Sequence, residues 1–211
     1  MANNISSNTK NRLPFYLEYL RKIYTEGQVN ISSGAIAQAL NLGEVQVRKD
    51  LASVSSNGKP KVGYEIVNLI KDLEDYLGYK DTDDAVVFGA GKLGMALLDY
   101  QGFLECGLNL VGAFDVDKKK HGVSESGKII EGNEYFPSFN KDNKVKIGIL
   151  CVPENNAQEV CDFMIQNGIK AILNFAPIHL NVPEDIIVKN ENLAYSLALL
   201  SIELKSKEKN K

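Results

Sequence analysis

Three glycines at G-x-G-x-x-G spacing offer the clearest chemistry in the sequence. Gly89, Gly91 and Gly94 follow the apolar run 85–88 and precede the helix-forming run 95–98. In a strand–turn–helix unit the first glycine permits a tight turn, the second lets backbone N–H groups approach a pyrophosphate, and the third lets the helix pack on the strand. We expect a dinucleotide to be bound by Gly89, Ala90, Gly91, Lys92, Leu93 and Gly94.

An acidic residue follows where such a site needs one. The apolar run 108–114 ends at Asp115, 21 residues after Gly94, and a carboxylate there suits a ribose diol. Lys118–Lys120 could instead mark a 2′-phosphate site, but Asp115 would repel that phosphate, so we favour NAD and expect the lysines to be solvated. The alternative is a glycine turn in some other α/β domain.

The elements that position these residues alternate between strand and helix. Residues 146–153 resemble a parallel strand buried on both faces, 157–165 have helical spacing, and 171–177 form another strand with its loop. This alternation predicts an α/β fold with a Rossmann parallel sheet over residues 81–190. The nicotinamide end of the ligand is expected in an apolar pocket formed by Tyr100, Val152, Pro153, Phe175 and Pro177.

Basic residues are concentrated at the front of the chain. Residues 1–64 contain eight Lys and Arg against four Asp and Glu, although the whole chain has a net charge of −3. This asymmetry indicates a polyanionic partner for the front alone.

Two short helices within that front form a helix-turn-helix pattern. One follows Ser33 as its N-cap, the other spans 44–54, and the Gly-containing turn 41–43 separates them. The outward face of the second helix is basic, small and hydroxylic, as a DNA major groove requires, and the Gly/Pro turn 57–64 predicts a wing. The residues expected to contact DNA are Val45, Arg48, Lys49, Ser53, Lys59 and Lys61. A solvated helix face would look similar.

Helices are also expected before and after this pair. Pro14 suits the first position of an opening helix that ends near Gly27, and a connecting helix over 65–77 stops at Gly78. The polar stretch 78–84 reads as a domain boundary. The expected organisation is a DNA-binding domain at 1–80, a nucleotide-binding domain at 81–190, and a C-terminal helix and tail at 191–211.

The last helix is apolar on many sides. Leu193, Leu197, Leu200 and Leu204 form one stripe, and further apolar residues lie elsewhere around the helix. Such a helix cannot rest on a single surface. It is either clasped between two domains or crosses to a partner subunit, and residues 205–211 are expected to be a disordered tail.

Composition excludes several classes of protein. The three cysteines form neither a disulfide frame nor a zinc motif, no apolar run is long enough to span a membrane, and the polar start lacks the apolar region of a signal peptide. We expect a cytoplasmic protein with no membrane partner.

The chain resembles the Rex family of redox-sensing transcriptional repressors over nearly its whole length. The motifs that carry this resemblance are Arg12-Leu-Pro14, Val47-Arg-Lys-Asp-Leu51, Gly58-Lys59, Val62-Gly-Tyr64, Gly89 to Gly94, Tyr100, Gly102-Phe103, Phe114-Asp-Val-Asp117, Val152-Pro153 and Asn174-Phe-Ala-Pro177. The resemblance implies an N-terminal winged helix, a Rossmann domain that binds NADH and NAD⁺, and a homodimer with swapped C-terminal helices. NADH is then expected to release the dimer from a palindromic double-stranded operator.

The resemblance also implies a switch formed by Arg12, Tyr100 and Asn192. Asn192 stands where the family often has the aspartate proposed to meet the tyrosine across the dimer, so this contact is expected to be neutral here. The stretch 53–57 and Pro60-Lys61 also depart from the family pattern, which leaves the operator sequence open.

The rival interpretations are a small NAD-dependent dehydrogenase and a CoA-binding Rossmann protein. A dehydrogenase needs a proton donor beside the nicotinamide, and the better placed of the two histidines, His179, has no partner in the sequence. A substrate domain is also missing, because the first 80 residues read as DNA-binding helices. The sequence therefore favours a repressor that is not an enzyme.

Overall fold

The computed structural model describes residues 5–59 and 62–209. By its internal contacts the chain divides into two compact units, and the division falls between Asp81 and Thr82. Each unit has a hydrophobic core of its own.

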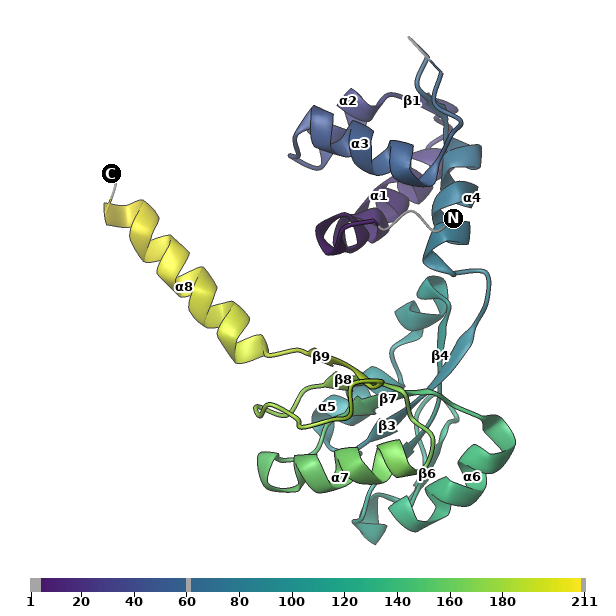
Figure 1. Ribbon diagram of the computed structural model, residues 1–211, viewed down its shortest axis with the longest axis vertical. Helices are drawn as coiled ribbons and strands as arrows, with labels where there is room; N and C mark the ends of the chain where they lie inside the picture. The colour runs from purple at the N-terminus through teal and green to yellow at the C-terminus, as the bar shows by residue number, and fades with distance from the viewer. Residues whose placement is uncertain (1–4, 60–61, 210–211) are drawn as a thin grey trace. The chain divides into compact units, whose positions relative to one another are not determined.

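The N-terminal unit is a winged helix-turn-helix (Figure 1). Its elements are α1 (Ser7–Thr25), β1 (Asn30–Ile31), α2 (Ser33–Ala39), α3 (Glu44–Val54), β2 (Tyr64–Glu65) and α4 (Ile66–Leu77). Strands β1 and β2 pair antiparallel, and a further bridge joins Lys59 to Gly63 in the predicted wing. The expected helix-turn-helix and connecting helix are both present.

Helix α1 begins a full two turns before the predicted start. The Ser6 hydroxyl caps it by accepting a hydrogen bond from the backbone N–H of Thr9 at 3.1 Å, so Pro14 lies inside the helix. A proline there lacks the N–H that would bond to Lys10. The buried side chains of Leu13 and Leu17 and the polar contacts of Thr9 compensate for that loss.

The C-terminal unit is a Rossmann domain. Its elements in chain order are β3 (Asp83–Phe88), α5 (Lys92–Leu98), η1 (Gln101–Cys106), β4 (Leu108–Phe114), η2 (Lys118–Lys120), β5 (Gly122–Val123), β6 (Ile129–Glu131), η3 (Asn133–Tyr135), α6 (Phe136–Asn143), β7 (Ile147–Leu150), α7 (Glu154–Gln166), β8 (Ala171–Asn174), β9 (Ile187–Asn190) and α8 (Leu193–Lys209).

Seven strands of the described chain form one sheet in the order β5-β6-β4-β3-β7-β8-β9. All neighbours run parallel except β5, which pairs antiparallel with β6 at the edge. Without β5 this is the doubly wound order 3-2-1-4-5-6, which reverses direction between β3 and β7. Ligands bind at the carboxyl ends of the strands beside such a reversal.

Both faces of the sheet are covered, as the apolar strands predicted. Along β3, Val86 and Phe88 enter the cluster that includes buried residues of α6 and α7, whereas Ala85 and Val87 enter the cluster that includes α5. This alternation follows from the two-residue period of a strand. The carboxyl end of β3 continues directly into the glycine loop.

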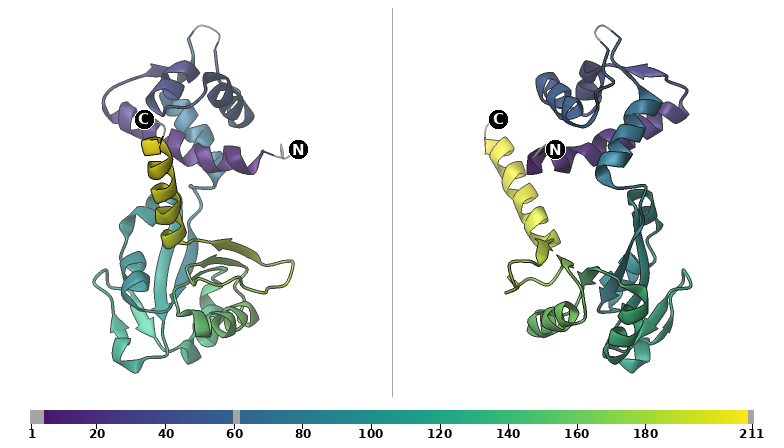
Figure 2. Two further views of the ribbon diagram at one scale, coloured as in Figure 1. Left: turned by 90° about the vertical axis from the view of Figure 1, so that its left-hand side faces the viewer. Right: turned by 45° about the vertical axis from the view of Figure 1, so that its right-hand side comes forward.

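Helix α8 is the yellow helix at the C-terminal end of the ribbon in Figure 2. None of its residues is buried within the single chain. Its large apolar side chains are 58–69% exposed, and the helix continues to Lys209 rather than ending near residue 204. No helix in the described chain is long and apolar enough to cross a membrane.

Candidate dinucleotide-binding and DNA-binding sites

The glycine loop between β3 and α5 requires glycine at Gly89 and Gly94 and leaves open space at Gly91. Gly89 has a φ of 101°, and a Cβ there would lie 2.6 Å from the carbonyl oxygen of Cys151. A Cβ on Gly94 would collide with the carbonyl oxygen of Gly89, which explains the close packing of helix on strand. Around Gly91 the space is open, so a phosphate can approach the backbone there.

Asp115 lies at the carboxyl end of β4 and is only 6% exposed. Its carboxylate accepts hydrogen bonds from the backbone N–H groups of Ala90 at 2.7 Å and Asp117 at 2.8 Å, and from the Lys120 ammonium at 2.8 Å. Burial acts to raise the pKa of Asp115, but these three donors outweigh burial and hold the pKa below its usual value. The carboxylate therefore stays ionised beside the glycine loop.

Lys120 forms an ion pair that the sequence did not indicate. Lys118, Lys119 and Lys120 are all exposed, as expected, and the Lys120 ammonium in addition folds back onto Asp115. Asp115 and Lys120 are only five residues apart, and the short helix η2 turns the chain so that their side chains meet. Apolar periodicity gives no signal for such a pair.

A cavity of about 500 Å³ opens beside Asp115 and the glycine loop, within the size range of small-ligand sites. The residues that line it are Gly89, Gly91, Phe114, Asp115, Val116, Asp117, Lys120, Asn133, Cys151, Val152, Pro153, Asn156 and Val160. The sequence-based prediction included five of these. The eight that it did not include are Phe114, Val116, Asp117, Lys120, Asn133, Cys151, Asn156 and Val160, of which Asn133 lies in η3 and Asn156 and Val160 lie in α7. Burial raises the pKa of the Cys151 thiol to about 12, so this sulfur is protonated and unreactive.

The residues expected at the nicotinamide end are distributed over several places. Val152 and Pro153 line the cavity, whereas Phe175 is half-buried in the core cluster on the α5 face. Pro177 lines a separate hollow of about 490 Å³ together with His179 and the first turns of α8. Tyr100 is 60% exposed and makes an edge-to-face contact with Phe103.

Asn192 acts locally in the structure. Its side-chain oxygen accepts a hydrogen bond from the backbone N–H of Tyr195 at 3.1 Å, the geometry of a helix N-cap for α8. Within the described C-terminal unit no hydrogen bond joins Asn192 to Tyr100. An asparagine serves this capping role as well as an aspartate would.

The predicted DNA-contacting residues of α3 lie on one outward face. Val45, Arg48 and Lys49 are exposed, and Lys59 is exposed next to the wing bridge. Ser53 is half-buried, and its hydroxyl donates to the carbonyl oxygen of Asp50 at 2.5 Å. Lys61 lies outside the described residues.

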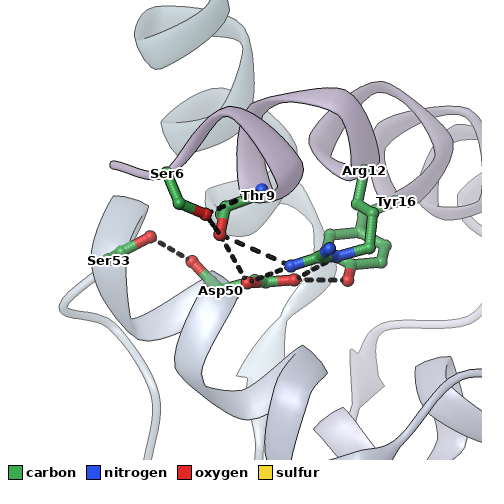
Figure 3. Close-up of polar contacts among 6 residues, drawn as sticks. All are labelled: Ser6, Thr9, Arg12, Tyr16, Asp50 and Ser53. Atoms are coloured by element: carbon green, nitrogen blue, oxygen red, sulfur yellow. Dashed lines mark hydrogen bonds and ion pairs between the residues drawn. The ribbon is translucent and has the colours of Figure 1, made fainter. Parts of the chain in front are cut away.

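The side of α3 that packs against α1 carries a buried carboxylate that apolar patterning did not reveal. Asp50 is 4% exposed and accepts hydrogen bonds from three residues of α1 (Figure 3). The donors are the Thr9 hydroxyl at 3.0 Å, the Arg12 guanidinium at 2.8 and 2.9 Å, and the Tyr16 hydroxyl at 2.7 Å. This network fixes the orientation of α3 against α1.

The network also fixes the charge states of its members. Burial acts to raise the pKa of Asp50, but the hydrogen bonds from Arg12, Tyr16 and Thr9 hold the pKa below its usual value. Burial and the bond to Asp50 raise the pKa of Tyr16 to about 12, so the phenol remains a donor. Arg12, which the family resemblance implies as a switch residue, thus has a local partner in its own unit.

The fold and the two sites together define a class of protein in which a winged helix of the kind that binds DNA is joined to a Rossmann domain of the kind that binds dinucleotides. Residues 4–52 match the family model of a putative DNA-binding protein N-terminus, and residues 80–178 match that of a CoA binding domain. Among the described residues no cluster of three metal-ligating side chains occurs.

Relatives match the chain over most of its length. A redox-sensing transcriptional repressor Rex from Pelotomaculum thermopropionicum is 40% identical and aligns with 95% of this chain and 94% of its own. The Rex protein of Treponema denticola is 41% identical over 93% and 94% of the two chains. The chain therefore belongs to the Rex family of redox-sensing transcriptional repressors.

Solved structures agree with this assignment. The crystal structure of the Rex-family repressor RSP in complex with β-NAD⁺ and operator DNA has a TM-score of 0.90 at 35% identity, covering 98% of this chain and 95% of that one. RSP in complex with β-NADH has a TM-score of 0.86 at 34% identity, covering 98% and 97%.

Proposed function

We propose that this chain is a cytoplasmic transcriptional repressor that senses the ratio of NADH to NAD⁺. The observation that carries the proposal is the presence, in one chain, of the exposed basic face of α3 and the cavity formed by the glycine loop and Asp115. The dinucleotide backbone lies on Gly89–Gly94, and Asp115 accepts hydrogen bonds from the adenine ribose. The resemblance to RSP bound to NAD⁺, NADH and operator DNA supports this assignment.

DNA is bound through the N-terminal unit. Helix α3 lies in a major groove with Val45, Arg48, Lys49 and Ser53 toward the bases or phosphates, and the wing supplies Lys59 and Lys61. The Asp50 network holds α3 in place while its exposed face binds.

The functional form is a homodimer in which α8 crosses to the partner. Seven large apolar side chains of α8 are more than half exposed in the single chain, and a solvated helix does not keep such a surface. A second copy, with the same helix, would cover this surface on both chains through one two-fold interface.

Redox discrimination takes place at the nicotinamide, because the glycine loop and Asp115 contact only atoms that NADH and NAD⁺ share. The oxidised ring is cationic, and an apolar pocket disfavours it through desolvation. We assign Tyr100, Val152, Pro153, Phe175 and Pro177 to that pocket. In the single chain only Val152 and Pro153 line the cavity beside the glycine loop, and the other three would join them in the dimer, where the partner's α8 closes the pocket. Arg12, Tyr100 and Asn192 couple it to DNA binding.

NADH shifts the equilibrium between two arrangements of the subunits in the dimer, because it binds one arrangement more tightly than the other. The favoured arrangement takes the two α3 helices out of register with successive major grooves, whose half-sites are about 34–36 Å or multiples of that apart. NAD⁺ competes for the cavity without this effect.

A gel shift on promoters of the source organism tests the proposal. The full-length chain should retard a palindromic promoter fragment in the presence of NAD⁺ and release it when NADH is added. Failure to bind any promoter, combined with turnover of a 2-hydroxy acid with NAD⁺, would favour the dehydrogenase alternative. Binding of CoA in place of NADH would favour the CoA-binding alternative.

A further inference from the structure

One carboxylate of α4 holds the chain that leads from α3 into the wing. Oδ2 of Asp72 accepts a hydrogen bond from the Ser55 hydroxyl at 2.5 Å and another from Nδ2 of Asn57 at 2.8 Å. The Ser55 hydroxyl in turn accepts a hydrogen bond from the backbone N–H of Asn57 at 3.2 Å. These contacts join the segment 55–57 to α4.

Helix α4 is a firm support for this segment. Leu69 and Leu73 are fully buried in the core cluster of the N-terminal unit, and the half-buried Asp72 stands next to Leu73. Ser55 directly follows α3 and is only 6% exposed. Because buried side chains fix α4 in the core, the hydrogen bonds to Asp72 also fix the position of the segment 55–57.

The next residue along the chain is held by packing. A Cβ on Gly58 would lie 2.8 Å from a ring carbon of Tyr64, a buried residue of β2. Lys59 follows, and its backbone N–H donates a hydrogen bond to the carbonyl oxygen of Gly63 at 2.8 Å. The chain is thus held at successive points up to Lys59, whose side chain is exposed.

We propose that Asp72 is a positioning residue for operator binding, which holds the wing so that its lysines reach the DNA phosphates. A loop that becomes ordered only on binding lowers the affinity, and a loop that is held in advance avoids this cost. The inference rests on the proposed binding of DNA by the N-terminal unit. Ser55 and Asn57, through which Asp72 acts, belong to the stretch 53–57 that departs from the family pattern.

Two substitutions of Asp72 separate this role from the effect of charge. Loss of a carboxylate near a polyanion strengthens binding by charge alone, whereas loss of positioning weakens it. Asp72→Asn and Asp72→Ala remove the same charge, but only asparagine keeps a side-chain oxygen. One oxygen is enough, because both hydrogen bonds go to Oδ2 in the structure.

The experiment is a titration of the full-length protein, with NAD⁺ present, against the promoter fragment that the native chain retards, followed by fluorescence anisotropy at several salt concentrations. At about 0.15 M salt Asp72→Ala should bind about fivefold more weakly than Asp72→Asn, and its slope of log affinity against log salt should be lower by about one, because one phosphate contact is lost. With Lys59 and Lys61 both changed to alanine, the two variants should bind alike within about twofold.

Asp75→Ala is the matched control. It removes an exposed carboxylate of the same helix that pairs with Lys80, and it should keep the native slope. Asn57→Ala changes no charge and lies at an exposed position, so it tests the proposal even if Asp72→Ala does not fold. It should lower the affinity about twofold, because one of the two hydrogen bonds to Asp72 is lost.

Equal affinities and slopes for the two Asp72 variants would overturn the inference, and so would a native affinity for Asn57→Ala. A loss in Asp72→Ala that keeps the native slope and persists without the wing lysines would also overturn it, because Asp72 would then have only a structural role. If the native chain bound no promoter fragment, the proposed function itself would be wrong.

Discussion

Asp50 and Asp115 are buried carboxylates that their neighbours keep ionised. In both, hydrogen bonds from cationic and neutral donors outweigh the effect of burial on the pKa. Asp50 joins two helices, whereas Asp115 joins the glycine loop to η2. Their removal should therefore have different consequences, one for stability and one for ligand binding.

Asp115→Ala should weaken NADH binding by a factor equivalent to about 1–3 kcal/mol, because a charged hydrogen bond to the ribose is lost. Calorimetric titration measures the change. Lys118→Ala, which removes an exposed lysine of the same short helix, should leave the affinity as it is. Unchanged affinity in the Asp115 variant would remove this residue from the site.

Asp50→Asn should destabilise the N-terminal unit by about 3 kcal/mol at pH 7, because a buried charged network loses its centre. The folded-state pKa of Asp50 is lowered, so its contribution is fully present above the unfolded value of about 3.9 and is lost as pH falls through the folded value. Urea unfolding followed by circular dichroism from pH 7 to pH 3 should show the two proteins converging on acidification. Parallel curves would contradict the assignment.

Asp185→Asn provides the control for that experiment. Asp185 pairs with Lys170 at the surface at 2.8 Å, with both side chains exposed. Such pairs contribute little to stability. The unfolding transition of this variant should match that of the native chain at every pH.

At the scale of single elements, local signals determined what could be predicted. The predicted span of α3 matches the structure because Gly43 precedes it and polar residues follow it, and the glycine spacing located the loop before α5. The start of α1 was wrong because Pro14 is a strong local signal that tertiary contacts of Thr9 with Asp50 override. Cap Ser32 lies one residue before the predicted Ser33.

The residues that were missed have long-range causes. Asp50, Lys120 and Asn133 are polar side chains whose partners, or whose lack of a partner, depend on elements distant in sequence or on a loop conformation. Periodicity of apolar residues carries no information about them. A sequence can therefore place the strands that support a site more readily than its polar details.

The wing gives a prediction at this scale. Lys59→Ala should weaken binding to all DNA sequences alike and reduce the slope of log affinity against log salt by about one, because one phosphate contact is lost. Lys141→Ala removes the same charge from α6 of the C-terminal unit and should leave the slope unchanged. An altered sequence preference with an unchanged slope would mean that the wing contacts bases.

For the whole molecule, the decisive element is α8. Truncation after Asn190 leaves β9 and the sheet complete, so the Rossmann unit should still fold, but analytical ultracentrifugation should detect a monomer with weak operator affinity. A chain ending after Lys205 loses only the polar end of the helix and should remain dimeric. A dimeric chain that ends at Asn190 and still releases DNA with NADH would rule out the proposed assembly.

The apolar surface of α8 also has a genetic consequence. The surface proposed for subunit pairing lies at the opposite end of the chain from the helix proposed for operator contact. A copy with an impaired α3 and an intact α8 would still pair with normal copies. Each mixed dimer would then contain only one functional DNA-binding unit. Such an allele, expressed beside the native gene, should be dominant negative, and deletion of α8 from the same allele should make it recessive.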